Sequence, residues 1–381
     1  MSNVIVDLKK IESNTKKIIS KFNNYKYYIA VVKTNAYGLG FEIVPSLIAG
    51  GVNYLAVSYI DEALKIREID KNIPILCLQP IDALDIDKAI SNNITITISS
   101  LNYLKSIYST INKKIKVHIK IDSGMNRLGV SSKEELNNVV NLINDNNNIN
   151  FEGLYTHFAT VGYIDKHYDE SLAKFKEIVS DIDLSIIPII HFGGSAALIA
   201  HNKISFVNGF RSGILFMGYN ISLFENKNGF KNKLRLLRNN IIKKCNNISN
   251  TNKNIDLKLE SPLSFYTKII EIKKVKKGEF IGYGASYKAS SDIVVAILPI
   301  GKANGISNNI NRFVFINNKK YYMIGNISMN MMIIKVDNSV KIGDDVEVIG
   351  PHISLGLHSN FNNESLADSL IGLSFNNKIY K

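Results

Sequence analysis

The stretch "YYIAVVKTNAYGLG", residues 27–40, joins an uninterrupted apolar run to a lysine, Lys33, and then to hydroxyl, amide and glycine residues. Apolar runs without alternation are typical of parallel strands that are buried on both faces of a sheet. The sequence therefore predicts a buried strand over 27–33 that ends in a cation. No GxGxxG follows this strand, which disfavours a doubly wound open sheet as the alternative fold.

Seven similar β-rich runs follow in the first half of the chain, at 54–60, 74–79, 94–99, 116–123, 151–157, 186–194 and 204–213. Amphipathic stretches such as 58–69 and 132–145 separate most of them. In the second of these, Ser132 and Glu135 have the spacing of a capping box at a helix start. Eight strand–helix units in this length predict an α/β fold with an N-terminal (β/α)8 TIM barrel.

The sequence changes character after the barrel region. Residues 225–256 are polar and rich in Asn and Lys, which indicates a linker or an insertion. Beyond them, alternating runs and turn pairs such as Asn317-Asn318 and Gly343-Asp344 predict a C-terminal all-β domain. The expected domains are therefore a barrel over 1–224, the Asn/Lys-rich segment over 225–256 and the β domain over 257–381.

Composition excludes several classes of function. The formal charge of +13 is spread along the 381 residues without clusters of lysine and aromatic residues, which disfavours a nucleic-acid partner. No apolar run reaches about 18 residues, so no membrane span is expected, and the N-terminus has no signal-peptide core. Only Cys77 and Cys245 are present, which favours a cytoplasmic protein without disulfides, and no group has metal-ligand spacing.

The functional residues of a barrel enzyme lie at the C-terminal ends of its strands. Here those ends carry Lys33, Lys120, Arg127, His157, "HFGGSAA" with Ser195, and "RSGI" with Arg211, Gly213 and Ile214. A single strand-end lysine usually only extends its amine to solvent, and a single histidine usually belongs to the core. The rim after the last two strands is the usual phosphate site of such barrels, and glycines there admit backbone amides to a phosphate. A phosphate site that shares its rim with a lysine fits pyridoxal 5′-phosphate (PLP), which needs a Schiff-base lysine and a phosphate anchor.

Eight motifs in order resemble the alanine racemase family: "AVVKTNAYGLG", "KIDSGMNRLGV", "THFAT", "HFGGSAA", "FRSGILFMGY", "IGYGASYKA", "LPIGKANG" and "GNISMNMMIIKVD". The resemblance covers nearly the whole chain. It implies a homodimeric PLP enzyme in which Lys33 forms the Schiff base and acts as one acid/base. Tyr283 of "IGYG", supplied by the partner subunit, would be the second.

The resemblance also implies roles for the remaining motif residues. The phosphate would be held by Tyr37, Ser195, Gly213 and Ile214. Arg211 would contact the pyridine nitrogen, and Arg127 would contact the phenolic oxygen and the substrate carboxylate. His157 would be a cofactor residue next to Tyr283, Met329 would donate its amide to the substrate, and Lys120 matches a lysine that is carbamylated in some relatives. Two bases are needed because inversion removes a proton from one face of Cα and delivers one to the other.

Several positions depart from the family pattern. Leu39 stands for the usual histidine, Gly194 for an asparagine, Lys302 for a tyrosine, Asn304 and Asn330 for aspartates, and Phe375 for a tyrosine. These departures are expected to affect substrate choice, cofactor affinity and rate. They leave Lys33, Arg127, Arg211 and Tyr283 unchanged. The predicted function is interconversion of L- and D-alanine for peptidoglycan synthesis. The alternatives are a racemase for serine or another amino acid, a related PLP-dependent decarboxylase, and a non-catalytic PLP-binding protein.

Overall fold

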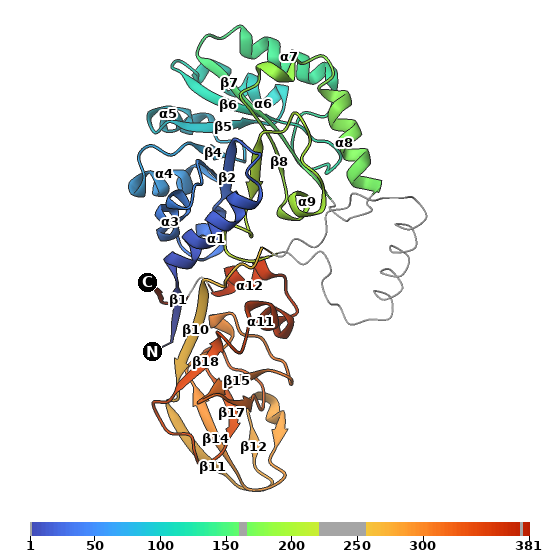
Figure 1. The fold of residues 1–381 in the computed structure, drawn as a ribbon. Coiled ribbons are helices and arrows are strands. Elements are labelled where there is room, and N and C mark those ends of the chain that lie inside the picture. Colours follow the sequence, from blue (N-terminus) through green and yellow to red (C-terminus); the bar gives the residue numbers. More distant parts are fainter. Residues whose placement is uncertain (1, 160–165, 221–256, 374–375) are drawn as a thin grey trace. The chain divides into compact units, whose positions relative to one another are not determined.

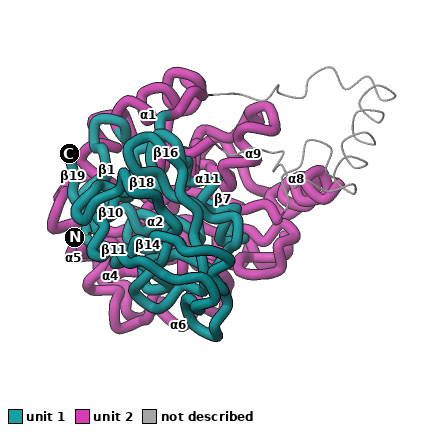
Figure 2. The backbone as a smooth tube through the Cα atoms, turned by 90° about the horizontal axis from the view of Figure 1, so that it is seen from below, with its two compact units in different colours: residues 1–11, 34–43, 260–381 teal, residues 12–33, 44–259 magenta. Residues whose placement is uncertain are grey.

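The computed structural model describes all residues except 1, 160–165, 221–256 and 374–375 (Figure 1). The chain divides into two compact units (Figure 2). Unit 1 comprises Met1–Ile11, Thr34–Ile43 and Glu260–Lys381, and unit 2 comprises Glu12–Lys33 and Val44–Leu259. No helix among the described residues is long and apolar enough to cross a membrane.

Eight parallel strands of unit 2 close into a barrel, which confirms the predicted fold. They are β2 (Tyr27–Val31), β3 (Tyr54–Val57), β4 (Ile75–Cys77), β5 (Ile94–Ile98), β6 (Ile115–Lys120), β7 (Ile149–His157), β8 (Ile189–Gly193) and β9 (Gly209–Ser212). The barrel closes because β2 pairs with both β3 and β9. Most strands are shorter than the apolar runs that predicted them, because the flanking apolar residues belong to the connections.

Helices connect most of these strands. They are α3 (Val44–Ala49), α4 (Ile60–Ile69), α5 (Ile86–Ser91), α6 (Leu101–Ile107), α7 (Lys133–Asn144), α8 (Lys166–Ile178) and α9 (Ser195–Ala200), while α1 (Leu8–Lys21) precedes β2. The predicted cap of α7 is confirmed, since the Ser132 hydroxyl accepts a hydrogen bond from the Glu135 amide at 3.2 Å. The Glu135 carboxylate does not return to Ser132 but accepts from the amides of Ser131 and Leu101.

Unit 1 is built mainly from antiparallel sheets, as the sequence predicts for the C-terminal region. One sheet has the order β16-β15-β18-β10-β1-β19, a second β11-β14-β17, and β12-β13 form a short ribbon. The strands are β1 (Asn3–Val6), β10 (Leu263–Lys268), β11 (Glu271–Val275), β12 (Phe280–Ile281), β13 (Tyr287–Lys288), β14 (Ile293–Leu298), β15 (Phe313–Ile316), β16 (Lys319–Tyr322), β17 (Met332–Val336), β18 (Asp345–Ile349) and β19 (Lys378–Tyr380). The helices α11 (Leu355–Asn362) and α12 (Leu366–Gly372), which the sequence did not predict, belong to the same unit.

Two local features of unit 1 bear on the sequence predictions. Asn317 and Asn318 have φ of 50° and 61° and form the predicted tight turn between β15 and β16. The first strand, β1, pairs with β10 and β19. The N-terminal residues therefore belong to unit 1, whereas the expected boundaries placed them in the barrel. The expected 225–256 segment lies outside the described residues.

Candidate active site

The segment after β2 has an unusual backbone. Lys33 follows the buried Val32, and the next four residues, Thr34–Tyr37, all have φ between 52° and 55°, the left-handed helical region. A left-handed helix costs a non-glycine residue roughly 1–2 kcal/mol, and such strain collects at functional sites. Hydrogen bonds within unit 1 hold the turn: Asn35 accepts from the amides of Gly40 and Phe41, and the Tyr380 hydroxyl donates to the Leu39 carbonyl. These hydrogen bonds therefore fix the backbone conformation of the residues that follow Lys33.

Strand register sets three rim positions side by side at the C-terminal end of the barrel. His157 of β7 pairs with Gly193 of β8, and Gly193 pairs with Arg211 of β9. A Cβ on Gly193 would clash with the Arg211 guanidinium and would lie 2.5 Å from the His157 Nδ1. Glycine is required here because the arginine and the histidine occupy the space that any side chain would need.

Five predicted basic residues share this rim: Lys33, Lys120, Arg127, His157 and Arg211. Burial, then the charges of Arg127, Arg211 and Lys33, lower the pKa of Lys120 to about 8. Burial and the same group of cations lower the pKa of His157 to about 3, so its imidazole is neutral at pH 7. The Lys120 ammonium and the Arg211 guanidinium lie 6.0 and 4.7 Å from the centroid of the same ring, that of Tyr155. Such a concentration of positive charge suits a ligand with several anionic groups.

The loop after β6 positions Arg127. The Asp122 carboxylate accepts hydrogen bonds from the amides of Gly124, Asn126 and Arg127 at 2.9–3.0 Å. Burial opposes ionisation of Asp122, but these amide bonds outweigh it and lower the carboxyl pKa. The carboxylate thus fixes the backbone that carries the Arg127 side chain.

The predicted phosphate residues of unit 2 lie after β8 and β9. The Ser195 and Ser212 hydroxyls are 2.5 Å apart, and α9 starts at Ser195. Gly194, just before it, has a φ of 120°, a conformation that disfavours the asparagine usual in the family. After β9, the Gly213 and Ile214 carbonyls accept from Met217 and Tyr219, as in the first turn of a helix. The amides of a first turn have no partner within it, so they suit an anion.

Arg211 is held on three sides and is only 3% exposed. Its Nη2 donates to the Thr156 carbonyl at 2.8 Å, its Nη1 donates to His191 Nδ1 at 2.8 Å, and its guanidinium lies 4.7 Å from the Tyr155 ring centroid. The Tyr155 ring in turn stacks on His191 at 4.8 Å. Arg211 is therefore fixed before any ligand binds.

A chain of hydrogen bonds continues from Arg211 through the barrel interior, and we call it the histidine chain. It consists of Arg211, His191, His118, Glu152 and Lys116, with successive contacts of 2.8, 2.9, 3.1 and 2.9 Å. Gly153 and Gly209 make room for it, because a Cβ on either would lie 2.5–2.6 Å from His118 or His191.

The direction of the bonds in the histidine chain follows from its ends. Arginine is only a donor, so His191 Nδ1 accepts. Burial lowers the pKa of both His191 and His118, so both rings are neutral, and each Nε2–H donates onward, to His118 Nδ1 and to the Glu152 carboxylate. Burial opposes ionisation of Glu152, but hydrogen bonds from His118 and Lys116 bring its pKa to about 2. The carboxylate end is therefore ionised.

The sequence prediction missed His118, Glu152 and His191. A signal was present: in "IKVHIK" the polar residues alternate with apolar ones along a single barrel strand, β6. With a period of two, Lys116, His118 and Lys120 share one face of that strand. A strand whose inward face is polar indicates a barrel with a polar interior.

Two further predicted residues, Tyr283 and Met329, lie on adjacent loops of unit 1. Asn326 joins the loops, since its side chain donates to the Tyr283 carbonyl at 3.0 Å and its amide donates to the Ser286 hydroxyl. Tyr283 is 70% exposed and Met329 is 62% exposed. The Met329 carbonyl accepts from Ala303, and no described residue accepts a hydrogen bond from the Met329 amide.

The remaining predicted and departing residues lie in several places. Tyr37 is half-buried in unit 1, and Leu39, in the same turn, is fully buried. Lys302 and Asn330 are exposed on the loops that flank Met329. Asn304 bonds to the Gly301 amide and the Asn376 side chain, so it serves the turn itself. Phe375 lies outside the described residues.

An eight-stranded barrel with a cationic rim, continued by a β unit, is the architecture of the barrel-type amino-acid racemases. A model of the N-terminal domain of alanine racemase matches residues 6–221, and a model of the C-terminal domain matches residues 263–370. The chain therefore belongs to the alanine racemase family, whose members are isomerases.

Individual relatives agree with this assignment. An alanine racemase from Streptococcus equi subsp. zooepidemicus is 32% identical over 349 residues, which covers 91% of this chain and 87% of the relative. One from Staphylococcus epidermidis is 30% identical over 352 residues, covering 89% and 85%. The crystal structure of alanine racemase from Bacillus anthracis with bound L-Ala-P superposes with a TM-score of 0.84 at 26% identity, and the match covers 100% of this chain and 95% of that one.

Proposed function

We propose that this protein is a PLP-dependent racemase that interconverts L- and D-alanine. The observation that carries the proposal is the barrel rim, where Lys33 follows β2 and where His157, Gly193 and Arg211 are paired across neighbouring strands. Relatives named alanine racemase, similar over most of the chain, favour alanine as the substrate. We further propose that the D-alanine serves peptidoglycan synthesis and that the enzyme acts in the cytoplasm.

The donors at the rim fit PLP. The Ser195 hydroxyl and the amides at Gly213 and Ile214 match a phosphate, Arg127 matches the phenolic oxygen, and Lys33 supplies the amine; Tyr37 would complete the phosphate site. When bound, PLP withdraws electrons from Cα of the amino acid and so makes the Cα hydrogen acidic. The residues of the chain supply the rest of the chemistry.

Arg211 determines the charge at the pyridine nitrogen. Its guanidinium is a permanent cation held by Thr156 and His191, and beside the pyridine nitrogen it would donate a hydrogen bond and oppose protonation of that nitrogen. An unprotonated ring withdraws electrons less strongly, which limits side reactions such as transamination. The arginine thus favours proton return to Cα.

Lys33 and Tyr283 move the protons. One takes the Cα proton from one face while the other delivers a proton to the opposite face, and their roles reverse for the other enantiomer. Arg127 orients the substrate through its carboxylate, and the Met329 amide donates to the same group. We propose that Tyr283 and Met329 act on the barrel rim of a partner subunit in a homodimer. Their large exposure in one chain is consistent with a surface that a second copy covers.

Lys120 is proposed to carry a carbamate. With a pKa of about 8, part of its amine is neutral at physiological pH, and the neutral amine adds CO2 with loss of a proton. The product would place a negative charge beside Arg127 and orient that guanidinium. Carbon-13 NMR in the presence of labelled bicarbonate tests for it, and a spectrum without a carbamate signal would exclude it.

The proposed reaction is tested by a D-amino-acid oxidase-coupled assay with added PLP over a panel of L-amino acids. The proposal expects D-alanine as the main product. A higher kcat/KM for serine or another amino acid would replace alanine as the substrate, release of CO2 would identify a decarboxylase, and neither product would indicate a PLP-binding protein without catalysis.

A further inference from the structure

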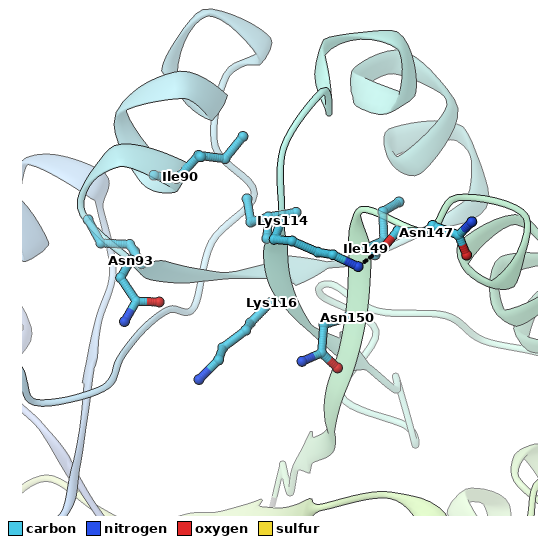
Figure 3. A pocket seen from close by; sticks show the side chains of 10 residues that line it. Ile90, Asn93, Lys114, Lys116, Asn147, Ile149 and Asn150 are labelled. Atoms are coloured by element: carbon cyan, nitrogen blue, oxygen red, sulfur yellow. Dashed lines mark hydrogen bonds between the residues drawn. The ribbon is translucent and has the colours of Figure 1, made fainter.

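A pocket lies at the N-terminal ends of three barrel strands, at the opposite end of unit 2 from the lysine rim (Figure 3). It has a volume of about 470 Å³. We call it the floor pocket, and the residues that matter for its chemistry are Ile90, Asn93, Lys114, Lys116, Asn147 and Asn150. Nothing in the proposed racemase reaction uses these residues.

The charged groups of the floor pocket are cations. Lys114 and Lys116 line it, and no aspartate or glutamate does. Lys114 donates to the Asn147 carbonyl at 2.5 Å, and Lys116, 39% exposed, pairs with Glu152 at 2.9 Å. Each ammonium has three hydrogens, and these contacts use one of each. Two lysines and the Glu152 carboxylate leave one net positive charge.

The other groups that line the floor pocket could contact an organic ligand as well as a simple ion. Asn93 and Asn150 are exposed at the pocket and offer amide donors and acceptors, while Ile90 adds an apolar surface. In Figure 3, Lys116 extends between Asn93 and Asn150. A cavity of this size holds several atoms beyond a carboxylate group, and the net charge matches a monoanion.

The floor pocket is also one end of the histidine chain. Glu152 Oε2 is already satisfied by Tyr54 at 2.8 Å and by His118 at 3.1 Å, whereas Lys116 is bonded to the other oxygen. Lys116 is the cation among these three partners, since Tyr54 and the neutral His118 ring are uncharged, so without it the Glu152 carboxylate would keep only hydrogen bonds from neutral groups. A ligand that draws Lys116 away changes the charge balance at Glu152 and, through it, at His118.

We propose that the floor pocket binds a small organic carboxylate, which takes Lys116 from Glu152 and is thereby coupled to the histidine chain. The ligand carboxylate accepts from Lys114 and Lys116, and its remaining atoms contact the two asparagines and Ile90. Ligand binding at the floor pocket does not depend on the proposed function. Only an effect that reaches Arg211 through His191, and from there the cofactor, would rest on the proposed function. The floor pocket lies at the far end of the barrel strands from the rim, so a ligand bound there would not compete with the substrate.

The test titrates 4,4,4-trifluorobutyrate into the full chain and follows binding by fluorine-19 NMR. Lys116→Gln and Lys114→Gln should each weaken binding about tenfold or more, because each removes a charge-assisted hydrogen bond. Lys65→Gln, which removes an exposed lysine of α4, is the matched control and should leave binding unchanged. Lys114→Gln keeps the test valid if the loss of the Lys116–Glu152 pair destabilises the other variant.

Nitrogen-15 spectra of histidine-labelled protein test the coupling. The chain has seven histidines, and the His118 ring signals should shift on saturation in the wild type. Absence of saturable binding, or binding unchanged in both lysine variants, overturns the site. Binding without a shift of His118 overturns the coupling. If inorganic phosphate competes more tightly than the carboxylate, the proposed ligand class is wrong.

Discussion

The barrel rim and the loops of the β unit carry the two halves of the proposed site, and they differ in how firmly they are held. Arg211 at the rim is 3% exposed and has two hydrogen bonds and a ring contact. Tyr283 in the β unit is 70% exposed. The rim residues are therefore held in place by contacts within one chain, whereas the Tyr283 side chain is exposed and available for contact with a second subunit.

This difference separates the roles of the two halves. A preorganised cationic rim binds and orients, because its groups need no rearrangement when an anionic ligand arrives. An exposed tyrosine contributes to chemistry only when water is excluded around it, which a second subunit would do. Substitutions at the rim should therefore impair cofactor binding as well as the rate, whereas substitution of Tyr283 should impair the rate alone.

Lys33→Ala should have the largest effect. It removes both the amine that binds PLP and one of the two acid/base groups, so racemisation should fall by about 10⁴-fold or more. The visible absorbance of lysine-bound PLP should disappear as well. Lys65→Ala, at an exposed position of α4, is the control for loss of a lysine. Retained absorbance and activity in Lys33→Ala would contradict the assignment.

Tyr283→Phe should reduce racemisation by about 10²- to 10⁴-fold, the usual contribution of a positioned acid/base group. Cofactor absorbance should persist, because the rim is complete without the hydroxyl. Tyr322→Phe removes a hydroxyl from another tyrosine of unit 1, which is 50% exposed, and should leave the rate unchanged. A Tyr283→Phe enzyme with normal rates in both directions would remove the tyrosine from the mechanism.

Gly153→Ala should destabilise the barrel. A Cβ there lies 2.5 Å from the His118 ring, and overpacking of this kind costs about 1–3 kcal/mol of unfolding free energy. Gly356→Ala is the matched control, since its Cβ would meet only a side-chain oxygen at 3.8 Å. That control lies in α11 and should be neutral or stabilise by roughly 0.5–1 kcal/mol. Urea unfolding measures both, and equal midpoints would show that the histidine chain tolerates displacement.

The buried histidines should make stability depend on pH. The folded-state pKa values of His118, His157, His191 and His358 are lowered, mainly by burial, so the unfolded chain binds protons that the folded chain does not. The unfolding free energy should fall as pH drops below about 6.5, by up to about 1.4 kcal/mol per pH unit for each histidine.

Urea midpoints measured between pH 7.5 and 5.5 test this prediction. Glu152 stays ionised over this range, because its pKa is about 2. His157→Asn should reduce the slope. His167→Asn, at a residue whose side chain is 74% exposed, should leave it unchanged. A stability that does not change over this range would mean that these four histidines are not held neutral.

Local sequence patterns predicted the barrel, because parallel strands are continuous apolar runs, and the ends of those runs predicted where Lys33, Lys120 and His157 lie along the chain. The pairing of β1 with β10 and β19 was missed, since it joins residues far apart in sequence. The left-handed turn at Thr34–Tyr37 was also missed, because only its two later glycines signal an unusual backbone. The links from His191 through His118 to Glu152 depend on which strands are neighbours, and a single strand does not reveal them.

In the proposed homodimer, each site combines Lys33 of one subunit with Tyr283 of the other. Mixing inactive Lys33→Ala and Tyr283→Phe proteins under conditions of subunit exchange tests it directly. In a mixed two-fold dimer both lesions fall in one site and the other site is intact, so a 1:1 mixture should recover about a quarter of wild-type activity. A mixture that exchanges subunits and recovers no activity would show that the two residues act within a single chain.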